Sequence, residues 1–301
     1  MAINILGASG FIGKELRSYL ENTEKVIWPI SLRESNLKTV FKEPTVINLV
    51  GKAHDHKGTA SEEDYRYVNV ELAKQVFDAF VESGAKLLIH VSSLAALEEF
   101  ESTKPLTESD NCNPVSWYGK SKREAEEWLL AQNLPENKKL IILRPPMVHG
   151  PGDKGNLGLL YKLISKGIPY PLSSFDNKRS FISIDNFSFF IQQIIENQDK
   201  MTSGIYHVAD DEPVSTKEII EIIKQVTKKS VPNIALPKVL VKGIAKVGDV
   251  VPIPLNTNRL KKMTSDLLVS NAKIKQALGL EKLPLTAQEG LVKTIKSFGN
   301  E

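Results

Sequence analysis

The chain is poor in cysteine and carries little net charge. Its 301 residues include a single cysteine, Cys112, so no internal disulfide can form and a reducing compartment is expected. The 39 Lys and Arg side chains nearly balance the 36 Asp and Glu side chains. A net charge of +3 is too small to favour nucleic acid as a partner. We therefore expect a cytoplasmic protein that does not bind nucleic acid.

Long hydrophobic runs are also missing. No stretch of 18 uncharged apolar residues occurs, so the sequence predicts no membrane span. The nearest approach is 236–255, which lysines, an aspartate and prolines interrupt. The first residues, MAINILGASGFIG, are too rich in glycine for a signal peptide.

Short apolar runs alternate with helical patterns through the first half of the chain. Strands are predicted at 3–6, 25–31, 45–50, 86–93 and 139–144, with helices at 11–20, 62–84 and 117–132. Pro29 places the second strand at an edge or a bulge. Nearly continuous apolar strands separated by helices indicate an α/β fold, a Rossmann-type doubly wound parallel sheet covered on both faces.

The alternation ends in a segment rich in proline and glycine, 144–152, and the elements after it are mixed. A helix is predicted at 156–167, a strand and helix at 179–197, a strand at 204–210 and a helix at 215–229. We expect a nucleotide-binding domain at 1–150, to which 178–200 returns. Residues 151–301 are expected to form mainly a smaller mixed α/β substrate domain.

A glycine-rich loop, GASGFIG, joins the first strand to the first helix. Gly7, Gly10 and Gly13 permit a tight turn and a close approach of backbone to a pyrophosphate, which the helix N-terminus attracts. A purely structural turn is the alternative. The strand–turn–helix context favours a dinucleotide, and the loop residues assigned to its site are Gly7, Ser9, Gly10, Phe11, Ile12 and Gly13.

The residue after the second strand distinguishes a site for NAD from a site for NADP. An acid there favours NAD, whereas an arginine accommodates the extra phosphate of NADP. This chain has Arg33 and no acid at the strand end. The prediction therefore leans to NADP, although a solvated arginine beside Glu34 is the alternative.

Tyr118 and Lys122 are four residues apart at the start of a predicted helix, so they share one face. The same face continues through Ala125 and Leu129, which seek the core, while Arg123, Glu124, Glu126 and Glu127 are expected on the surface. A snorkelling lysine beside an ordinary tyrosine is the alternative. Ser92 and Ser93 end a predicted parallel strand, where open α/β sheets bind ligands.

Together these motifs resemble the extended short-chain dehydrogenase/reductase family, in the family's order and over essentially the whole chain. Segments 48–54 and 144–157 are similar to those that line the cofactor in nucleotide-sugar epimerases and reductases. The resemblance is strongest to bacterial UDP-N-acetyl-hexosamine 4-epimerases and 4-keto-reductases of surface-polysaccharide synthesis. It implies further cofactor contacts at Leu49, Val50, Gly51, Asn69, Tyr118, Lys122 and Pro145, and substrate contacts at Asn156, Arg179 and Arg259.

The resemblance implies a mechanism without a metal. Tyr118 moves the proton, Lys122 favours the phenolate and holds the nicotinamide ribose, and Ser93, rather than Ser92, orients the reacting oxygen. The same residues serve a 4-epimerase and a 4-keto-reductase, so both stay open. A non-catalytic NADP-sensing regulator is the alternative from another class. Analogy with the family suggests a homodimer through 62–84 and 117–132, and a monomer is the alternative because the exposed faces of these helices are charged.

Overall fold

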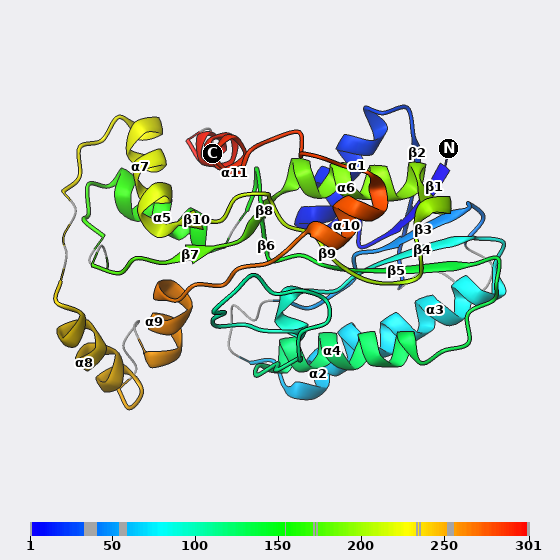
Figure 1. The fold of residues 1–301 in the computed structure, drawn as a ribbon, viewed down its shortest axis with the longest axis horizontal. Helices are drawn as coiled ribbons and strands as arrows, with labels where there is room; N and C mark the ends of the chain where they lie inside the picture. The colour runs from blue at the N-terminus through cyan, green and yellow to red at the C-terminus, as the bar shows by residue number, and fades with distance from the viewer. Residues whose placement is uncertain are drawn as a thin grey trace.

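The computed structural model describes residues 2–32, 41–53, 59–153, 155–170, 172, 174–232, 234, 236–251 and 256–299. Its largest element is a six-stranded parallel sheet in the order β2-β1-β3-β4-β5-β9 (Figure 1). The strands are β1 Ala2–Leu6, β2 Val26–Ile30, β3 Thr45–Asn48, β4 Leu87–Val91, β5 Lys139–Arg144 and β9 Gly204–His207.

Helices cover both faces of this sheet. On one face lie α1 Phe11–Glu21, α6 Ile184–Glu196 and α10 Ala272–Leu278, and on the other lie α3 Leu72–Glu82 and α4 Trp117–Leu130 (Figure 1). Every residue of β3 and β4 is buried, as expected for strands packed on both faces. The predicted Rossmann-type doubly wound sheet is confirmed. β2, which contains Pro29, lies at the edge of the sheet order, as the proline predicted.

A second apolar core is built from the later part of the chain. It joins α5, α7, α8, α11 and β8 through side chains such as Leu157, Ile220, Val241 and Leu291. By contrast, α6 contributes to the first core beside β1 and α1, because its isoleucines and phenylalanines face the sheet. The further elements here are β6 Met147–His149, α5 Asn156–Ser165, β7 Lys178–Arg179, β8 Phe181–Ser183, β10 Val214–Ser215, α7 Thr216–Thr227, α8 Lys238–Gly248, α9 Thr257–Thr264 and α11 Ala287–Ser297.

The long helix predicted at 62–84 is divided. α2 Glu62–Arg66 leads into a π-helical turn, Tyr67–Glu71, before α3 begins. Such turns insert one extra residue and are common at functional sites. The interruption lies around Asn69, a predicted cofactor contact, whose side chain is buried.

Short helical turns complete the chain at Leu94–Ala96 and Gln198–Lys200. None of the helices in the described ranges is both long and apolar enough to cross a membrane. The segment 236–255, which came closest by sequence, contains α8, a helix of 11 residues.

Candidate active site

The glycine loop makes a tight turn between β1 and α1. Gly7 has a φ of +80°, a conformation that favours glycine, and its carbonyl accepts a hydrogen bond from the Gly10 N–H at 3.1 Å. A Cβ on Gly13 would lie 2.7 Å from the Ala8 Cα and closer still to the Gly7 carbonyl oxygen, so this helix start has no room for a side chain. Gly10 is the N-cap of α1.

This loop fits a pyrophosphate. The first turn of α1 contains no acidic residue, and Ser9 and Gly10 are exposed at its start. The first turn of a helix has N–H groups without intrahelical partners, and these groups and the positive end of the helix dipole attract an anion. The end of β3 lies alongside, since a Cβ on Gly7 would lie 3.0 Å from the carbonyl carbon of Leu49.

α4 holds Tyr118 and Lys122 at the carboxyl end of β4. The Ser116 hydroxyl caps the helix by accepting the Gly119 N–H at 3.0 Å. One carboxylate oxygen of Glu99 accepts the Val115 and Ser116 N–H groups at 3.0 and 2.7 Å. Glu99 therefore fixes the point at which the chain enters α4, a role that the sequence pattern did not predict.

Lys122 is a buried lysine, as the stripe through Ala125 and Leu129 predicted. Its Nζ donates to the Val91 carbonyl at 3.0 Å, and a Cβ on Gly51 would lie 2.9 Å from the same nitrogen. The lysine thus joins the ends of β3 and β4. Burial lowers its pKa to about 8, and Glu126 opposes that shift.

Tyr118 is half-buried, and its environment disfavours the phenolate. Burial raises its pKa, while a hydrogen bond with Ser93 acts in the opposite sense. Glu99 and Tyr65 raise this pKa further, and Lys122 is not among the groups that shift it, so the predicted lowering by Lys122 is not seen among the protein groups. Ser93, half-buried, also accepts the Ala95 N–H at 3.2 Å, which holds its hydroxyl at the end of β4.

Asn69 connects three elements from within the π-helical turn. Its Oδ1 accepts the Lys52 N–H at 2.8 Å, and its Nδ2 donates to the Lys52 carbonyl and to the Ser121 hydroxyl. The loop after β3 is therefore tied to α4 beside Lys122. This contact places Gly51 against the lysine.

Glu126 was predicted on the surface, and this prediction is wrong. Its side chain is fully buried because Arg144 binds it with two hydrogen bonds, Nε to Oε1 at 2.9 Å and Nη2 to Oε2 at 2.6 Å. The Ser92 hydroxyl donates to the same carboxylate at 2.5 Å. Ser92 is thus engaged in the interior, and the assignment of Ser93 to the reacting oxygen stays a prediction.

The three predicted substrate residues lie on separate elements and are not brought together by any described contact. Asn156 begins α5, and its side chain lies outside the described part of the structure. Arg179 in β7 donates through Nη1 to the Phe100 and Ser265 carbonyls at 3.2 Å. Burial lowers the pKa of Arg179 to about 10. Arg259 is exposed on α9.

Four further residues predicted to bind the cofactor are Arg33, Pro145, Phe11 and Ile12. Arg33, on which the preference for NADP rests, lies outside the described residues. Pro145 is buried at the carboxyl end of β5, and its carbonyl accepts the Leu94 N–H at 2.8 Å, next to Ser93. Phe11 and Ile12, in the first turn of α1, are half-buried.

Gly119 lies where α4 packs closest to the end of β4. A Cβ there would lie 2.5 Å from the Ala95 carbonyl oxygen and 2.6 Å from Glu99 Oε1. Gly119→Ala should therefore shift the start of α4, lower stability by roughly 1–3 kcal/mol and reduce turnover, because Tyr118 moves with the helix. Thermal unfolding and steady-state rates measure both effects. Gly84→Ala is the control, since no atom lies within 4 Å of its Cβ; equal losses in the two variants would contradict the packing argument.

The chain is similar to known proteins over nearly its whole length. A UDP-glucose 4-epimerase of Vibrio cholerae is 31% identical over 324 residues, covering 99% of this chain and 95% of the relative. A solved UDP-glucuronic acid 4-epimerase from Bacillus cereus in complex with NAD superposes with a TM-score of 0.77 at 17% identity, covering 100% and 99% of the two chains. RMD from Pseudomonas aeruginosa complexed with NADPH gives 0.76 at 17% identity over the same shares.

A second curated relative is named for a lipid-linked sugar substrate. The N-acetyl-alpha-D-glucosaminyl-diphospho-ditrans,octacis-undecaprenol 4-epimerase of Escherichia coli O157:H7 is 26% identical over 262 residues, covering 77% of this chain and 74% of the relative. The profile of the NAD dependent epimerase/dehydratase family matches residues 3–209. The chain, which carries the glycine loop and the tyrosine–lysine pair inside that match, therefore belongs to the NAD dependent epimerase/dehydratase family.

Proposed function

We propose that the protein is a 4-epimerase of nucleotide sugars of the UDP-N-acetyl-hexosamine type. The chain is an NAD(P)-dependent member of an enzyme family, and its relatives include nucleotide-sugar 4-epimerases. The observation that carries the proposal is the junction of Ser93, Tyr118 and Lys122 beside the glycine loop. A 4-epimerase at 31% identity over nearly the whole chain supports the reaction type.

The residues present fit the dinucleotide. Gly7, Gly10 and Gly13 would admit the pyrophosphate at the start of α1, and the loop ending in Gly51 would line the nicotinamide side beside Lys122. When bound, the cofactor supplies a hydride acceptor and donor. The chain's own residues bind and orient it, and they move the proton.

The proton chemistry belongs to Tyr118 and Ser93. Held as a phenolate, Tyr118 would take the proton of the sugar 4-hydroxyl as C4 gives up its hydride to the bound cofactor, and the 4-keto sugar would then rotate within the site. The same hydride would return from the cofactor to the opposite face of C4, and Tyr118 would give the proton back to the oxygen, so that no net oxidation occurs. Ser93 holds that oxygen by a hydrogen bond. Because burial raises the pKa of the phenol, the positive charges of Lys122 and of the oxidised cofactor are needed to favour proton removal.

The N-acetyl-hexosamine preference rests on one relative, which by its description acts on an N-acetyl-glucosaminyl diphosphate. A lipid diphosphate in place of the nucleotide is therefore the second candidate for the substrate. We further propose that residues 151–301 hold mainly the substrate, with Asn156, Arg179 and Arg259 as the diphosphate contacts, and that the product enters surface-polysaccharide synthesis. We also propose that two copies of the chain form a homodimer through α2, α3 and α4.

Purified protein mixed with UDP-N-acetyl-glucosamine, without added cofactor, tests the reaction. We expect its conversion to UDP-N-acetyl-galactosamine, resolved by proton NMR of the anomeric signals, at a higher kcat/KM than for UDP-glucose. Consumption of NADPH with a 4-keto sugar and no epimerisation would instead identify a 4-keto-reductase. Binding of NADP with no turnover of either class would identify the regulator.

A further inference from the structure

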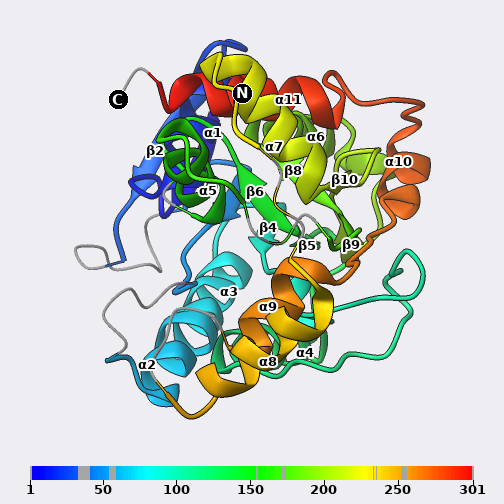
Figure 2. The ribbon, with the colours of Figure 1, turned by 90° about the vertical axis from the view of Figure 1, so that its left-hand side faces the viewer.

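α8 presents an apolar face to solvent at one end of the molecule. Val239 is 83% exposed and Val250, just past the helix, is 87% exposed; Leu240 and Val247 are more than half exposed. Figure 2 views this end directly and shows α8 beside α9, which agrees with their contacts. Exposed apolar side chains gathered in this way indicate an interaction surface.

The orientation of α8 is fixed by the opposite face. Val241 and Ala245, four residues apart, are 1% exposed and belong to the second core. Since the helix repeats every 3.6 residues, burying this pair directs Val239 and Val247 outward together. The exposure therefore follows from packing, and a rotation of α8 that hid the valines would expose the core pair.

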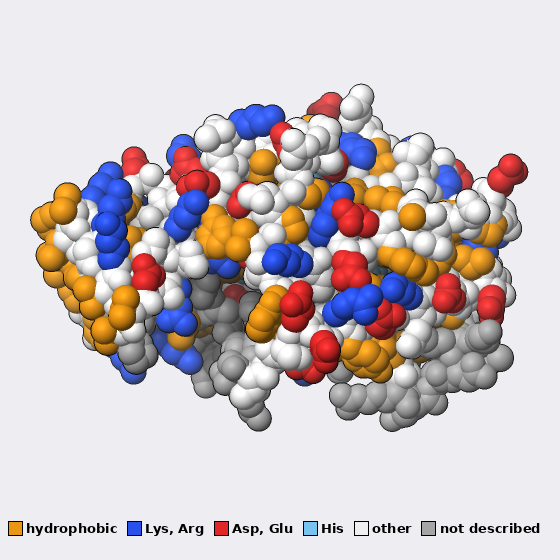
Figure 3. Space-filling model, turned by 90° about the horizontal axis from the view of Figure 1, so that it is seen from below, with side chains coloured by type: hydrophobic (Ala, Val, Ile, Leu, Met, Phe, Trp, Pro, Cys, Tyr) orange, Lys and Arg blue, Asp and Glu red, His pale blue; other side chains and the backbone are white. Residues whose placement is uncertain are grey.

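A row of lysines flanks the apolar face. Lys238, Lys242 and Lys246 follow at intervals of four residues, and all three are exposed. α8 itself contains no acidic residue. The carboxylate of its C-cap, Asp249, accepts hydrogen bonds from the backbone N–H and hydroxyl of Thr257 at 2.9 and 2.5 Å and adds one negative charge at the end of the row of three lysines. Figure 3 shows apolar side chains beside a run of Lys and Arg at the left-hand end, where α8 lies in Figure 1.

The neighbouring charges do not neutralise this row. On α9, Lys261 pairs with Glu101 at 2.9 Å and Lys262 with Glu99 at 3.5 Å, so these acids are already engaged. Lys238 lies over the Phe175 ring at 5.6 Å, which leaves its charge intact. Lys242 and Lys246 have no carboxylate partner among the residues that the structure describes.

We propose that α8 docks the protein onto an anionic lipid surface, with Val239, Leu240, Val247 and Val250 entering the interface and the lysine row meeting the headgroups. An amphipathic helix with cations along one flank and apolar side chains next to them is suited to this position. A helix of 11 residues is about 16 Å long, too short to span a bilayer core of about 30 Å, so it lies in the interfacial plane.

A second copy of the chain fits the face less well. Two copies related by a twofold axis would bring like lysine rows close together, and the described part of α8 offers no acid to balance them. An anionic surface balances all three charges at once. Docking would also set the active site near that surface, because Glu99, which holds the start of α4, contacts α9.

Flotation of the full chain with phosphatidylcholine vesicles, with and without phosphatidylglycerol, tests the proposal. Binding should require the anionic lipid and weaken as salt rises. Lys242→Gln combined with Lys246→Gln should reduce the partition coefficient by about 30-fold at low salt, since each lysine near an anionic surface contributes roughly fivefold. Val239→Ser with Val250→Ser should reduce it by about tenfold or more.

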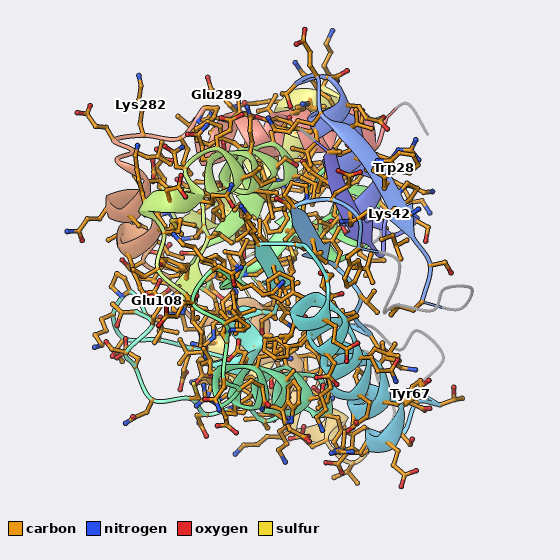
Figure 4. All side chains as sticks on the ribbon, turned by 90° about the vertical axis from the view of Figure 1, so that its right-hand side faces the viewer. Trp28, Lys42, Tyr67, Glu108, Lys282 and Glu289 are labelled. Atoms are coloured by element: carbon orange, nitrogen blue, oxygen red, sulfur yellow. The ribbon has the colours of Figure 1, made fainter. Side chains whose placement is uncertain are left out.

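Matched variants on other faces give the controls. Lys282 and Trp28 are exposed and lie on other parts of the surface (Figure 4), so Lys282→Gln and Trp28→Ser should leave binding unchanged. Equal midpoints of thermal unfolding for all variants would show that each variant is folded. The proposal is overturned by equal binding to neutral vesicles or by no vesicle binding. It is also overturned if the valine variant instead dissociates a dimer in size-exclusion chromatography. None of these results depends on the epimerase assay.

Discussion

Tyr118→Phe lowers kcat by roughly 10²- to 10⁴-fold, the range expected when a positioned acid–base group is removed. The phenol oxygen is the only part lost, and the ring stays half-buried next to Ser93. Lys122 keeps its bond to the Val91 carbonyl at 3.0 Å, so the cofactor side of the site is retained. We therefore expect cofactor binding within about twofold of the unaltered protein, measured by titration of intrinsic fluorescence, alongside steady-state rates.

The control for Tyr118→Phe is the same substitution at an exposed tyrosine. Tyr67 is 59% exposed at the start of the π-helical turn, so Tyr67→Phe should leave kcat unchanged. If Tyr118→Phe retained near-normal turnover, another residue would have to move the proton, and the role proposed for Tyr118 would be wrong.

Glu126→Gln should produce the largest loss of stability. The substitution leaves Arg144, which is 1% exposed, with a buried charge and no countercharge from Glu126. Removing one partner of a buried ion pair costs about 3–5 kcal/mol. The Ser92 hydroxyl also loses its carboxylate acceptor. The midpoint of urea unfolding, read by circular dichroism, should fall accordingly.

The control for Glu126→Gln is the same substitution at the neighbouring Glu127. Glu127 is 59% exposed and pairs with Arg123 at 2.8 Å, so Glu127→Gln removes a surface pair worth at most about 1 kcal/mol. A similar midpoint for the two variants would show that the buried pair does not stabilise the fold as described.

The sheet and its helices were predictable because the pattern of apolar residues within each short segment indicates which side chains are buried. Apolar runs such as LLIHV become strands buried on both faces, and the 4, 3, 4 spacing from Tyr118 correctly placed Lys122 toward the interior. The glycine loop was also predictable, since Gly7 and Gly13 occupy positions where a side chain has no room.

Other parts of the site depend on partners distant in sequence. Glu126 looks like one of a run of surface charges, and only the approach of Arg144, 18 residues later, makes its burial favourable. Glu99 likewise gains its role from N–H groups 16 and 17 residues away. The face of α8 could not be assigned either, because apolar residues occur on both sides of that helix and packing decides which side is covered.

Release of the bound nucleotide from purified protein, by denaturation without any addition, tests the central claim most directly. Because the epimerase reaction restores its cofactor in every turnover, we predict a stoichiometric NAD(P) identified by mass and absorbance. NADP would agree with the prediction from Arg33, and NAD would overturn that prediction alone. A protein that releases no nucleotide and oxidises NADPH stoichiometrically with a 4-keto sugar would contradict the epimerase assignment.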